Sequence, residues 1–495
     1  MKKLLMLLLA TLLEAGQDSL LTSYQADYTL SYENIDLKAG EQMGLMGIGM
    51  HFDISRYSYG GAMLYGAVDG KRGGFFTVGA DGGLKTNLSK NLQMRSGLFI
   101  GAGGGGSAPQ GGGLMLRPYT ELRWQSPDFS VGAGISHIYF PNGEIESTQG
   151  YLSLQIPTGG AYLKGHPALL PQADNTSSHS TGQNRLQLSM FAQHYKPDSS
   201  SRNTDGTPTQ PFTLAGIKLE KALNHQLYSY FQAAGAGDGE SDGYMEVFGG
   251  LGYRYQIADL PLYLGAEAAV GASGGGRVDT EGGLVYRAQG TLQADLGKHV
   301  SLTGFAGRIE SLHGSFGAQS YGGTLTYRST FFDILPNDPT VQTDTSAWRV
   351  RMLNKSYLNG KALFKDDRDV SRVDLLGFAI DRYLGEYLYL TGQTYWAYRG
   401  RAGGYAEGIF GLGYQSSRYG DFSCYGEMLA GVGGGGGIDI GGGLWGSIGG
   451  GITYAIDESW EFSLGADYMR NKADSFSTTD VTFGISYRFS LLEER

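Results

Sequence analysis

The sequence has few of the residues that build disulfides and metal sites. Cys424 is its only cysteine, and there are eight histidines among 495 residues. A lone cysteine excludes an internal disulfide and a thiolate metal cluster. The histidines form no His-x-x-x-His pair, so the usual helical metal motif is absent. We therefore expect no metal and no cofactor.

Charged residues are also scarce, at 17% of the chain, whereas ordinary globular proteins carry about 25%. The net charge is −10, and an acidic chain lacks the basic face that a nucleic-acid partner requires. No interior run reaches about 18 apolar residues, so we expect no transmembrane helix. These features exclude a nucleic-acid-binding protein and a helical membrane protein.

The N-terminus has a different composition from the rest of the chain. Two lysines, Lys2 and Lys3, precede an apolar run from Leu4 to Leu13, which is the layout of a secretory signal. We predict a signal peptide over residues 1–15 and export from the cytoplasm. The alternative interpretation is a buried N-terminal segment.

Glycine is abundant, with 82 residues, and it recurs at a long period. The cluster at Gly101 returns at Gly271 and Gly431, which are 170 and 160 residues further along. Other landmarks keep these offsets within a few residues, including Gly74, Gly243 and Gly404, and Gly113, Gly283 and Gly443. Such a period predicts a triplicated structural unit. The units span 24–158, 185–329 and 348–490, separated by Pro-containing linkers or loops at 159–184 and 330–347.

Alternation of apolar and polar residues with a period of two predicts strands along each unit. In the last segment Phe483, Ile485 and Tyr487 face one way, whereas Thr482 and Ser486 face the other. Each unit divides into about eight segments of roughly ten residues, separated by short turn sequences. About 24 strands in all, each near ten residues, is the strand density of a transmembrane β-barrel.

A soluble β-sandwich also hides one face and exposes the other. The export signal, the aromatic content and the Tyr and Trp residues near the ends of the apolar faces favour a membrane barrel instead. In this pattern the chain resembles Gram-negative outer-membrane β-barrel proteins as a class, although it carries no family-specific motif. The resemblance implies an all-β, antiparallel transmembrane barrel that contacts outer-membrane lipid. Such proteins typically end in an aromatic residue, whereas here the tail 490–495 follows Phe489.

The three units could close in two ways. One large barrel of about 24 strands would hold a wide lumen, whereas three eight-stranded barrels would have interiors filled by side chains. An even number of strands returns each unit to the same side of the membrane, so both closures are allowed. The long linkers fit the three-barrel version, and we favour the single large barrel.

Several charged residues fall on the polar faces of the predicted strands, where they would line a lumen. Glu267 and Arg287 are placed across the second glycine-rich hairpin and are predicted to be near cross-strand neighbours. Charges facing a wet lumen pair with one another or bias the passage of ions; the alternative is a solvated wall with no such role. The lumen-lining candidates are Glu246, Glu267, Arg287, Glu407, Glu427 and Arg117.

The repeated glycines form a second set of candidates. Glycine on an inward face lets another backbone approach closely, or leaves space for a solute; the alternative is that it accommodates sheet curvature. The close-approach candidates are Gly101, Gly103, Gly271, Gly275, Gly431 and Gly433.

No catalytic arrangement stands out, and we expect no enzyme. Residues Gly271 to Gly275 match a Gly-x-Ser-x-Gly pattern, but that motif needs a following helix. The favoured function is an outer-membrane channel or export conduit for polar solutes or polymer. One alternative is a scaffold barrel with a blocked lumen that displays loops such as 196–211 or binds a periplasmic or secreted partner. Another is a lipid-modifying outer-membrane hydrolase.

Overall fold

The computed structural model describes residues 21–165, 183–332, 343–358, 363–366, 370–472 and 476–494. The predicted signal peptide 1–15 lies outside them, as do the central parts of both predicted linkers. The described residues form 24 strands and one short 3₁₀ helix, Lys38–Gly40. None of their helices is long and apolar enough to span a bilayer. The expectation of an all-β, antiparallel chain of 24 strands is confirmed.

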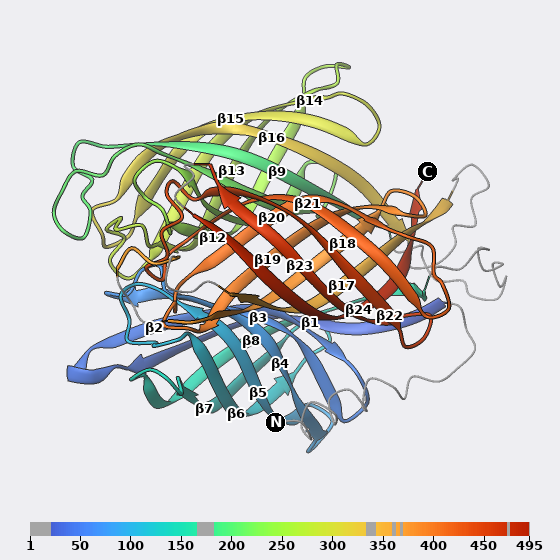
Figure 1. Cartoon of the computed structure of the whole chain (residues 1–495), viewed down its shortest axis with the longest axis horizontal. Coiled ribbons are helices and arrows are strands. Elements are labelled where there is room, and N and C mark those ends of the chain that lie inside the picture. Colours follow the sequence, from blue (N-terminus) through green and yellow to red (C-terminus); the bar gives the residue numbers. More distant parts are fainter. Residues whose placement is uncertain are drawn as a thin grey trace.

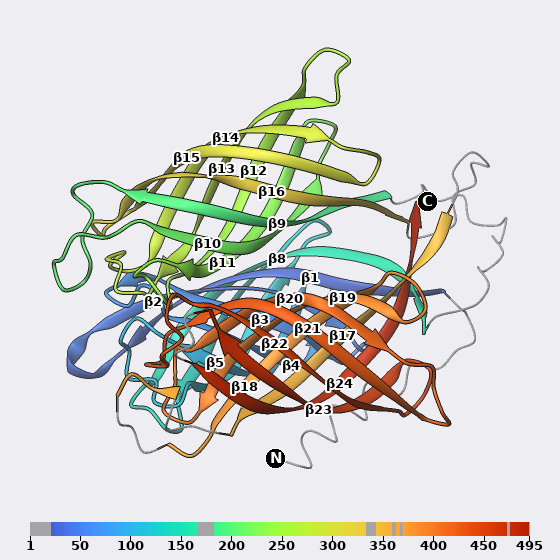
Figure 2. The same cartoon turned by 45° about the horizontal axis from the view of Figure 1, so that its top comes forward.

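The strands form three closed rings of eight (Figures 1 and 2). The first ring closes because β1 pairs with both β2 and β8, with Leu30 opposite Leu154. Its strands are β1 (Leu21–Asp36), β2 (Gln42–Asp53), β3 (Ser58–Gly70), β4 (Phe76–Asn87), β5 (Leu92–Gly104), β6 (Leu114–Gln125), β7 (Ser130–Tyr139) and β8 (Glu146–Lys164).

The second ring closes in the same way, because β9 pairs with both β10 and β16. Its strands are β9 (Gln183–Pro197), β10 (Phe212–Ala222), β11 (Leu227–Asp238), β12 (Met245–Gln256), β13 (Leu262–Gly274), β14 (Leu284–Asp295), β15 (Val300–Ser311) and β16 (Gly317–Phe332).

The third ring closes through β17, which pairs with both β18 and β24. Its strands are β17 (Thr343–Tyr357), β18 (Val373–Tyr383), β19 (Leu388–Arg399), β20 (Ala406–Gln415), β21 (Phe422–Gly434), β22 (Leu444–Ala455), β23 (Trp460–Asn471) and β24 (Ser477–Glu494).

The prediction of one 24-stranded barrel is therefore wrong in its closure. The first and last strands of each repeat run antiparallel, so they satisfy each other's edge hydrogen bonds directly. Closed rings leave no unpaired strand edge, and eight strands suffice to form one. The first and last strands of each repeat reach beyond the predicted unit limits. As a result, the predicted linkers 159–184 and 330–347 lose residues to strands at both ends.

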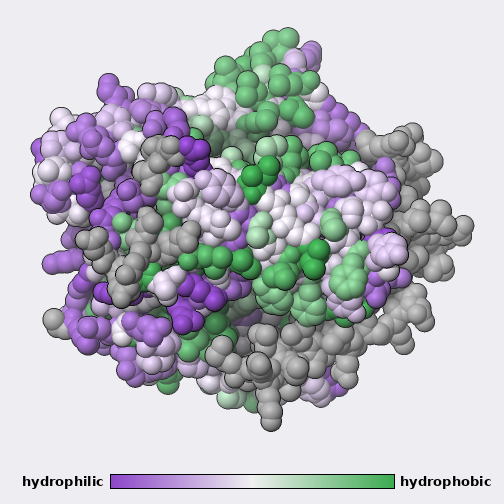
Figure 3. All heavy atoms as spheres, viewed as in Figure 1, coloured by the Kyte–Doolittle hydropathy of each residue, from purple (hydrophilic) through white to green (hydrophobic). Residues whose placement is uncertain are grey.

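The outer surfaces of the rings are apolar and exposed. Leu152, Leu251 and Ile448, at mid-height of their strands, are 64%, 60% and 63% exposed. Exposed aromatic residues lie nearer the strand ends, including Tyr32, Trp124, Tyr253, Tyr286, Tyr414 and Tyr468. Figure 3 shows polar residues gathered over the end that carries the longer loops, with apolar residues over the strand bodies. An apolar band bordered by aromatic residues is the exterior of a membrane-spanning barrel.

Each barrel has a turn end and a loop end. At the turn end, short turns such as 54–57 join the strands, and the C-terminus lies there too (Figure 1). At the loop end lie the glycine-rich connections 105–113, 275–283 and 435–443. All three barrels point the same way, because each repeat begins and ends at the turn end.

The barrels contact one another in a cyclic order. The third strand of each repeat contacts the fifth strand of the next repeat: β3 contacts β13, β11 contacts β21, and β19 contacts β5. A single chain thus reproduces the arrangement of a cyclic trimer, with the same interface used three times.

Candidate functional site

Glu246 and Glu267 are two of the buried carboxylates inside the second barrel. Glu246 lies 3.7 Å from Arg287, between Oε1 and Nη1, and both side chains are fully buried. Tyr195 donates a hydrogen bond to Glu246 over 2.7 Å, and Arg287 donates to Gln193 and Gln232. These contacts hold both charged side chains in the interior of the barrel.

Glu267 lies in the same interior with different partners. It pairs with Lys218 and accepts hydrogen bonds from Tyr228 and Gln289. Its cross-strand neighbour is Gln289, whereas Arg287 lies opposite Ala269. The hairpin is centred one residue later than predicted, which moves the partner of Glu267 by two positions.

The other lumen-lining candidates are also buried and paired. Glu407 lies 3.1 Å from Lys355, Glu427 lies 2.8 Å from Arg351, and Arg117 lies 2.7 Å from Glu33. All six predicted residues therefore lie inside barrels. Most of their partners could not be predicted from the sequence, because they lie on strands that are not adjacent in the sheet. These partners are Glu33, Lys218, Arg351 and Lys355.

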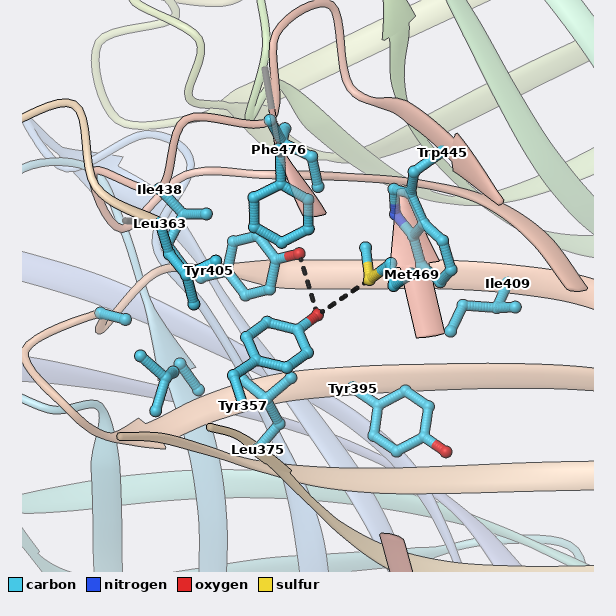
Figure 4. Packing of buried hydrophobic residues seen from close by; sticks show 14 of the residues in the cluster. Tyr357, Leu363, Leu375, Tyr395, Tyr405, Ile409, Ile438, Trp445, Met469 and Phe476 are labelled. Carbon is cyan, nitrogen blue, oxygen red and sulfur yellow. Dashed lines mark hydrogen bonds between the residues drawn. The ribbon is translucent and has the colours of Figure 1, made fainter. Parts of the chain in front are cut away.

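Above the charged layer, the loop end of each barrel is filled by apolar and aromatic side chains. In the third barrel the Tyr357 hydroxyl lies 3.3 Å from that of Tyr405 and 3.4 Å from the Met469 sulfur, with Trp445 and Phe476 in the same cluster (Figure 4). Equivalent clusters fill the first barrel around Phe75 and Phe99, and the second around Phe212 and Phe316. We call these clusters the apolar caps.

The turn end of the first barrel is more open. A cavity of about 430 Å³ lies there, lined by residues that include Asp27, Asp53, Lys85 and Arg95. In the second barrel a cavity of only about 20 Å³ lies between Arg254, Tyr263 and Gln293. The first and second barrels therefore differ in the volume of these cavities.

The predicted close-approach glycines do lie against neighbouring atoms. At Gly101, Gly103, Gly271, Gly275 and Gly431 a Cβ would come within 3.0 Å of atoms that include a backbone carbonyl oxygen of the adjacent strand or its connection. At Gly433 the nearest atom would be the Ala406 carbonyl oxygen, at 3.1 Å. These six glycines therefore permit close backbone approach within one barrel.

Other repeated glycines make the contacts between barrels. A Cβ on Gly74, Gly243 or Gly404 would come within 3.0 Å of the backbone of Gly275, Gly435 or Gly105 in the next barrel. Backbone hydrogen bonds cross two of these contacts, from Gly73 to Glu281 and from Gly404 to Gly103. An apolar cluster that includes Val68, Phe76, Val247, Ala272 and Trp396 joins all three repeats beside them. The glycine period thus encodes the inter-barrel interface.

The C-terminal tail joins the barrels at the opposite end. Ser490 of β24 pairs with Leu163 of β8, and Leu492 pairs with Phe332 of β16. Leu163, Phe332 and Leu492 form a buried cluster. Arg382 binds both Glu493, at 2.9 Å, and the hydroxyl of Tyr327 in the second barrel. We call residues 490–494 with these partners the turn-end clasp.

The first barrel also contains a hydroxyl–imidazole–carboxylate chain that the sequence analysis did not identify. Thr29 Oγ1 lies 3.0 Å from His51 Nδ1, and His51 Nε2 lies 3.3 Å from Asp81. All three residues are buried, and Tyr119 donates to Asp81 from the other side. Ser273 of the Gly-x-Ser-x-Gly match is fully buried and lies in β13 with no helix after it. Among the described residues, no group of three or more His, Cys, Asp or Glu side chains could hold a metal ion.

Neither a protein-family model nor a curated protein matches the chain. Similar solved structures include OccK8 (OprE) of Pseudomonas aeruginosa, with 10% identity and a TM-score of 0.22 over 95% of this chain and 98% of that one. The ferric enterobactin receptor PfeA has 10% identity and a TM-score of 0.28, over 94% and 81% of the two chains. The copper transporter OprC has 12% identity and a TM-score of 0.28, over 94% and 80%. The chain's own residues build three barrels with apolar exteriors, apolar caps and paired interior charges.

Proposed function

We propose that the chain is a bacterial outer-membrane protein that crosses the bilayer with three sealed barrels and acts as a scaffold for its loop face. The apolar exterior with its aromatic borders supports the membrane location, with outer-membrane lipid as the partner of that surface. The scaffold proposal rests on the side chains that fill the barrel interiors. A periplasmic or secreted partner stays a prediction.

Two successive layers support the sealed state. The apolar caps place buried hydrophobic side chains across the loop end of each barrel. In the charged layer below them, ion pairs and hydrogen bonds link strands that are not neighbours in the sheet. In the third barrel, for example, Arg351 of β17 binds Glu427 of β21 at 2.8 Å, and Arg349 of β17 binds Gln415 of β20 at 2.8 Å. An eight-stranded barrel has an interior that side chains can fill completely.

Contacts between segments of the loop face support the scaffold proposal. Lys365 of the third repeat binds Asp242 of the second at 2.7 Å, and Arg72 binds Glu41 at 2.6 Å. Within 196–211, a stretch that the sequence suggested for display, Ser201 Oγ donates to the Gly317 carbonyl and Thr204 N to the Arg277 carbonyl. The loops are thus held in place by contacts with other segments.

A transport channel is the second candidate, because the cavity of about 430 Å³ opens the turn end of the first barrel. Planar-bilayer recording with the full chain distinguishes the two, with a large-pore porin as positive control. The scaffold proposal predicts a sealed membrane. Reproducible stepwise conductance would overturn it and support the channel.

A further inference from the structure

The cavity at the turn end of the first barrel has a polar lining of both charge signs. Its charged residues are Asp27, Asp53, Lys85 and Arg95, and amide side chains such as Gln25 and Gln93 lie between them. A volume of about 430 Å³ falls within the range of small-molecule sites, about 300–1,000 Å³. The cavity therefore has the size and chemistry of a site for a small polar solute.

The other two barrels carry different side chains at the corresponding positions. The strand registers place Gln187 and Arg349 at the position of Asp27, and Tyr263 and Ser423 at that of Gln93. In the second barrel Arg254 reaches across to Gln187, Gln293 and Glu220.

In the third barrel Gln415 accepts hydrogen bonds from Arg349, Tyr383 and Arg488. These long side chains extend across that mouth. The first barrel has Asp27 where the third has Arg349, and the shorter carboxylate leaves the space open.

The charges in the cavity are not equally accessible. The Asp53 and Asp27 side chains are 34% and 20% exposed, whereas those of Lys85 and Arg95 are 7% and 3% exposed. Asp53 pairs with Lys85 at 2.5 Å, and Asp27 receives Arg95 and Arg123, each at 3.1 Å. The carboxylates therefore present the accessible surface, with the cations behind them.

Arg95 retains donor capacity in this arrangement. Its Nε donates to Gln93 and its Nη2 to Asp27, whereas Nη1 has no hydrogen-bond partner among the described residues. That nitrogen is buried, so it does not face a ligand in the cavity. A ligand that carries both charges can insert into the accessible Asp53–Lys85 pair, because its ammonium group replaces Lys85 at Asp53 and its carboxylate receives the freed Lys85.

We propose that the turn-end cavity of the first barrel binds a small zwitterionic solute with a primary ammonium group and a carboxylate, of amino-acid to dipeptide size. Asp53 and Asp27 accept hydrogen bonds from the ammonium group, and Lys85 pairs with the carboxylate. The site goes beyond the scaffold function and does not depend on whether the lumen conducts.

Ligand-observed NMR titration of the full chain in detergent micelles tests the proposal. Glycylglycine is the zwitterionic probe, and N-acetylglycinamide is the neutral control. We expect glycylglycine to bind at least tenfold more tightly than the neutral compound. Absence of glycylglycine binding, or equal binding of the two compounds, would overturn the proposal.

Two variants locate the site. Gln93→Tyr copies Tyr263 of the second barrel and is expected to abolish binding by filling the cavity, and Asp53→Asn is expected to weaken it at least fivefold. Glu310→Gln, a charge change on the loop-end half of the second barrel, is the matched control and should bind as the unaltered chain does. A gel shift on boiling verifies that each variant is folded. Unchanged binding in folded Gln93→Tyr would contradict the assignment, whatever the conductance of the chain.

Discussion

At the residue scale, Gly74 shows what the repeated glycines do. Its φ is +84°, and a Cβ there would come within 3.0 Å of the Gly275 backbone in the next barrel. Gly206 has nearly the same φ, +83°, but nothing lies within 4 Å of the position of its Cβ. Alanine would meet the same backbone strain at both positions, whereas its Cβ would be crowded only at position 74.

We therefore expect Gly74→Ala to lower the free energy of unfolding by about 1–3 kcal/mol more than Gly206→Ala. The measurement is the urea midpoint of each variant, followed by tryptophan fluorescence in detergent micelles. Equal midpoints for the two variants would show that the close approach at Gly74 is unimportant.

Arg287 and Glu246 provide a second residue-scale prediction. Removing the guanidinium in Arg287→Met leaves a fully buried carboxylate without its counter-charge, which should cost about 3–5 kcal/mol. The double variant Arg287→Met with Glu246→Gln should recover much of that loss. Heat-modifiability gels over a temperature series measure the effect, and a single variant as stable as the unaltered chain would refute the pairing.

The inward direction of these charges could be predicted from the sequence, because alternation assigns each strand residue to one face. Their partners could not. Glu246 meets Arg287 across strands that are not neighbours in the sheet, and Lys218 reaches Glu267 from β10. Contacts across a lumen depend on barrel diameter and strand stagger, which no local pattern encodes.

At the element scale, the tail after Phe489 is the least expected feature. The aromatic alternation ends there in the sequence, yet β24 continues to Glu494 and pairs with strands of both other barrels. No pattern within a single repeat could predict this role, because the partners Leu163 and Phe332 end the other two repeats.

Leu492→Asp should open the turn-end clasp, because it buries a charge in the cluster with Leu163 and Phe332. Leu260→Asp, which places the same charge on an exposed turn of the second barrel outside the clasp, is the control. Spin labels on Lys90 and His225, in turns of different barrels, report the separation by pulsed dipolar spectroscopy. We expect a broader distance distribution for Leu492→Asp alone, and an unchanged distribution would contradict the role of the clasp.

At the scale of the whole molecule, the number of strands followed from the alternation and the threefold repeat from the glycine period. The closure of the barrels could not be predicted in this way. The edge of β8 could pair with β1 or with β9, and either pairing would satisfy the backbone hydrogen-bonding groups of that edge. From the sequence alone, the repeated glycines indicate sheet curvature or the close approach of another backbone inside a lumen. Their additional role between barrels follows only from three rings placed side by side.

Disulfide formation between β1 and β8 tests the three-ring account most directly. In a Cys424→Ser background, one double variant carries cysteines in place of both Ser31 and Ser153, and another in place of both Leu30 and Leu154. These are adjacent register pairs between β1 and β8, and in an antiparallel ladder one of two adjacent pairs has the shorter Cα–Cα distance. The account predicts that at least one pair forms an intramolecular disulfide under mild oxidation of the folded protein in micelles. Failure of both pairs, together with a disulfide between cysteines at Ser153 and Ser189 of β9, would contradict it and indicate one large barrel.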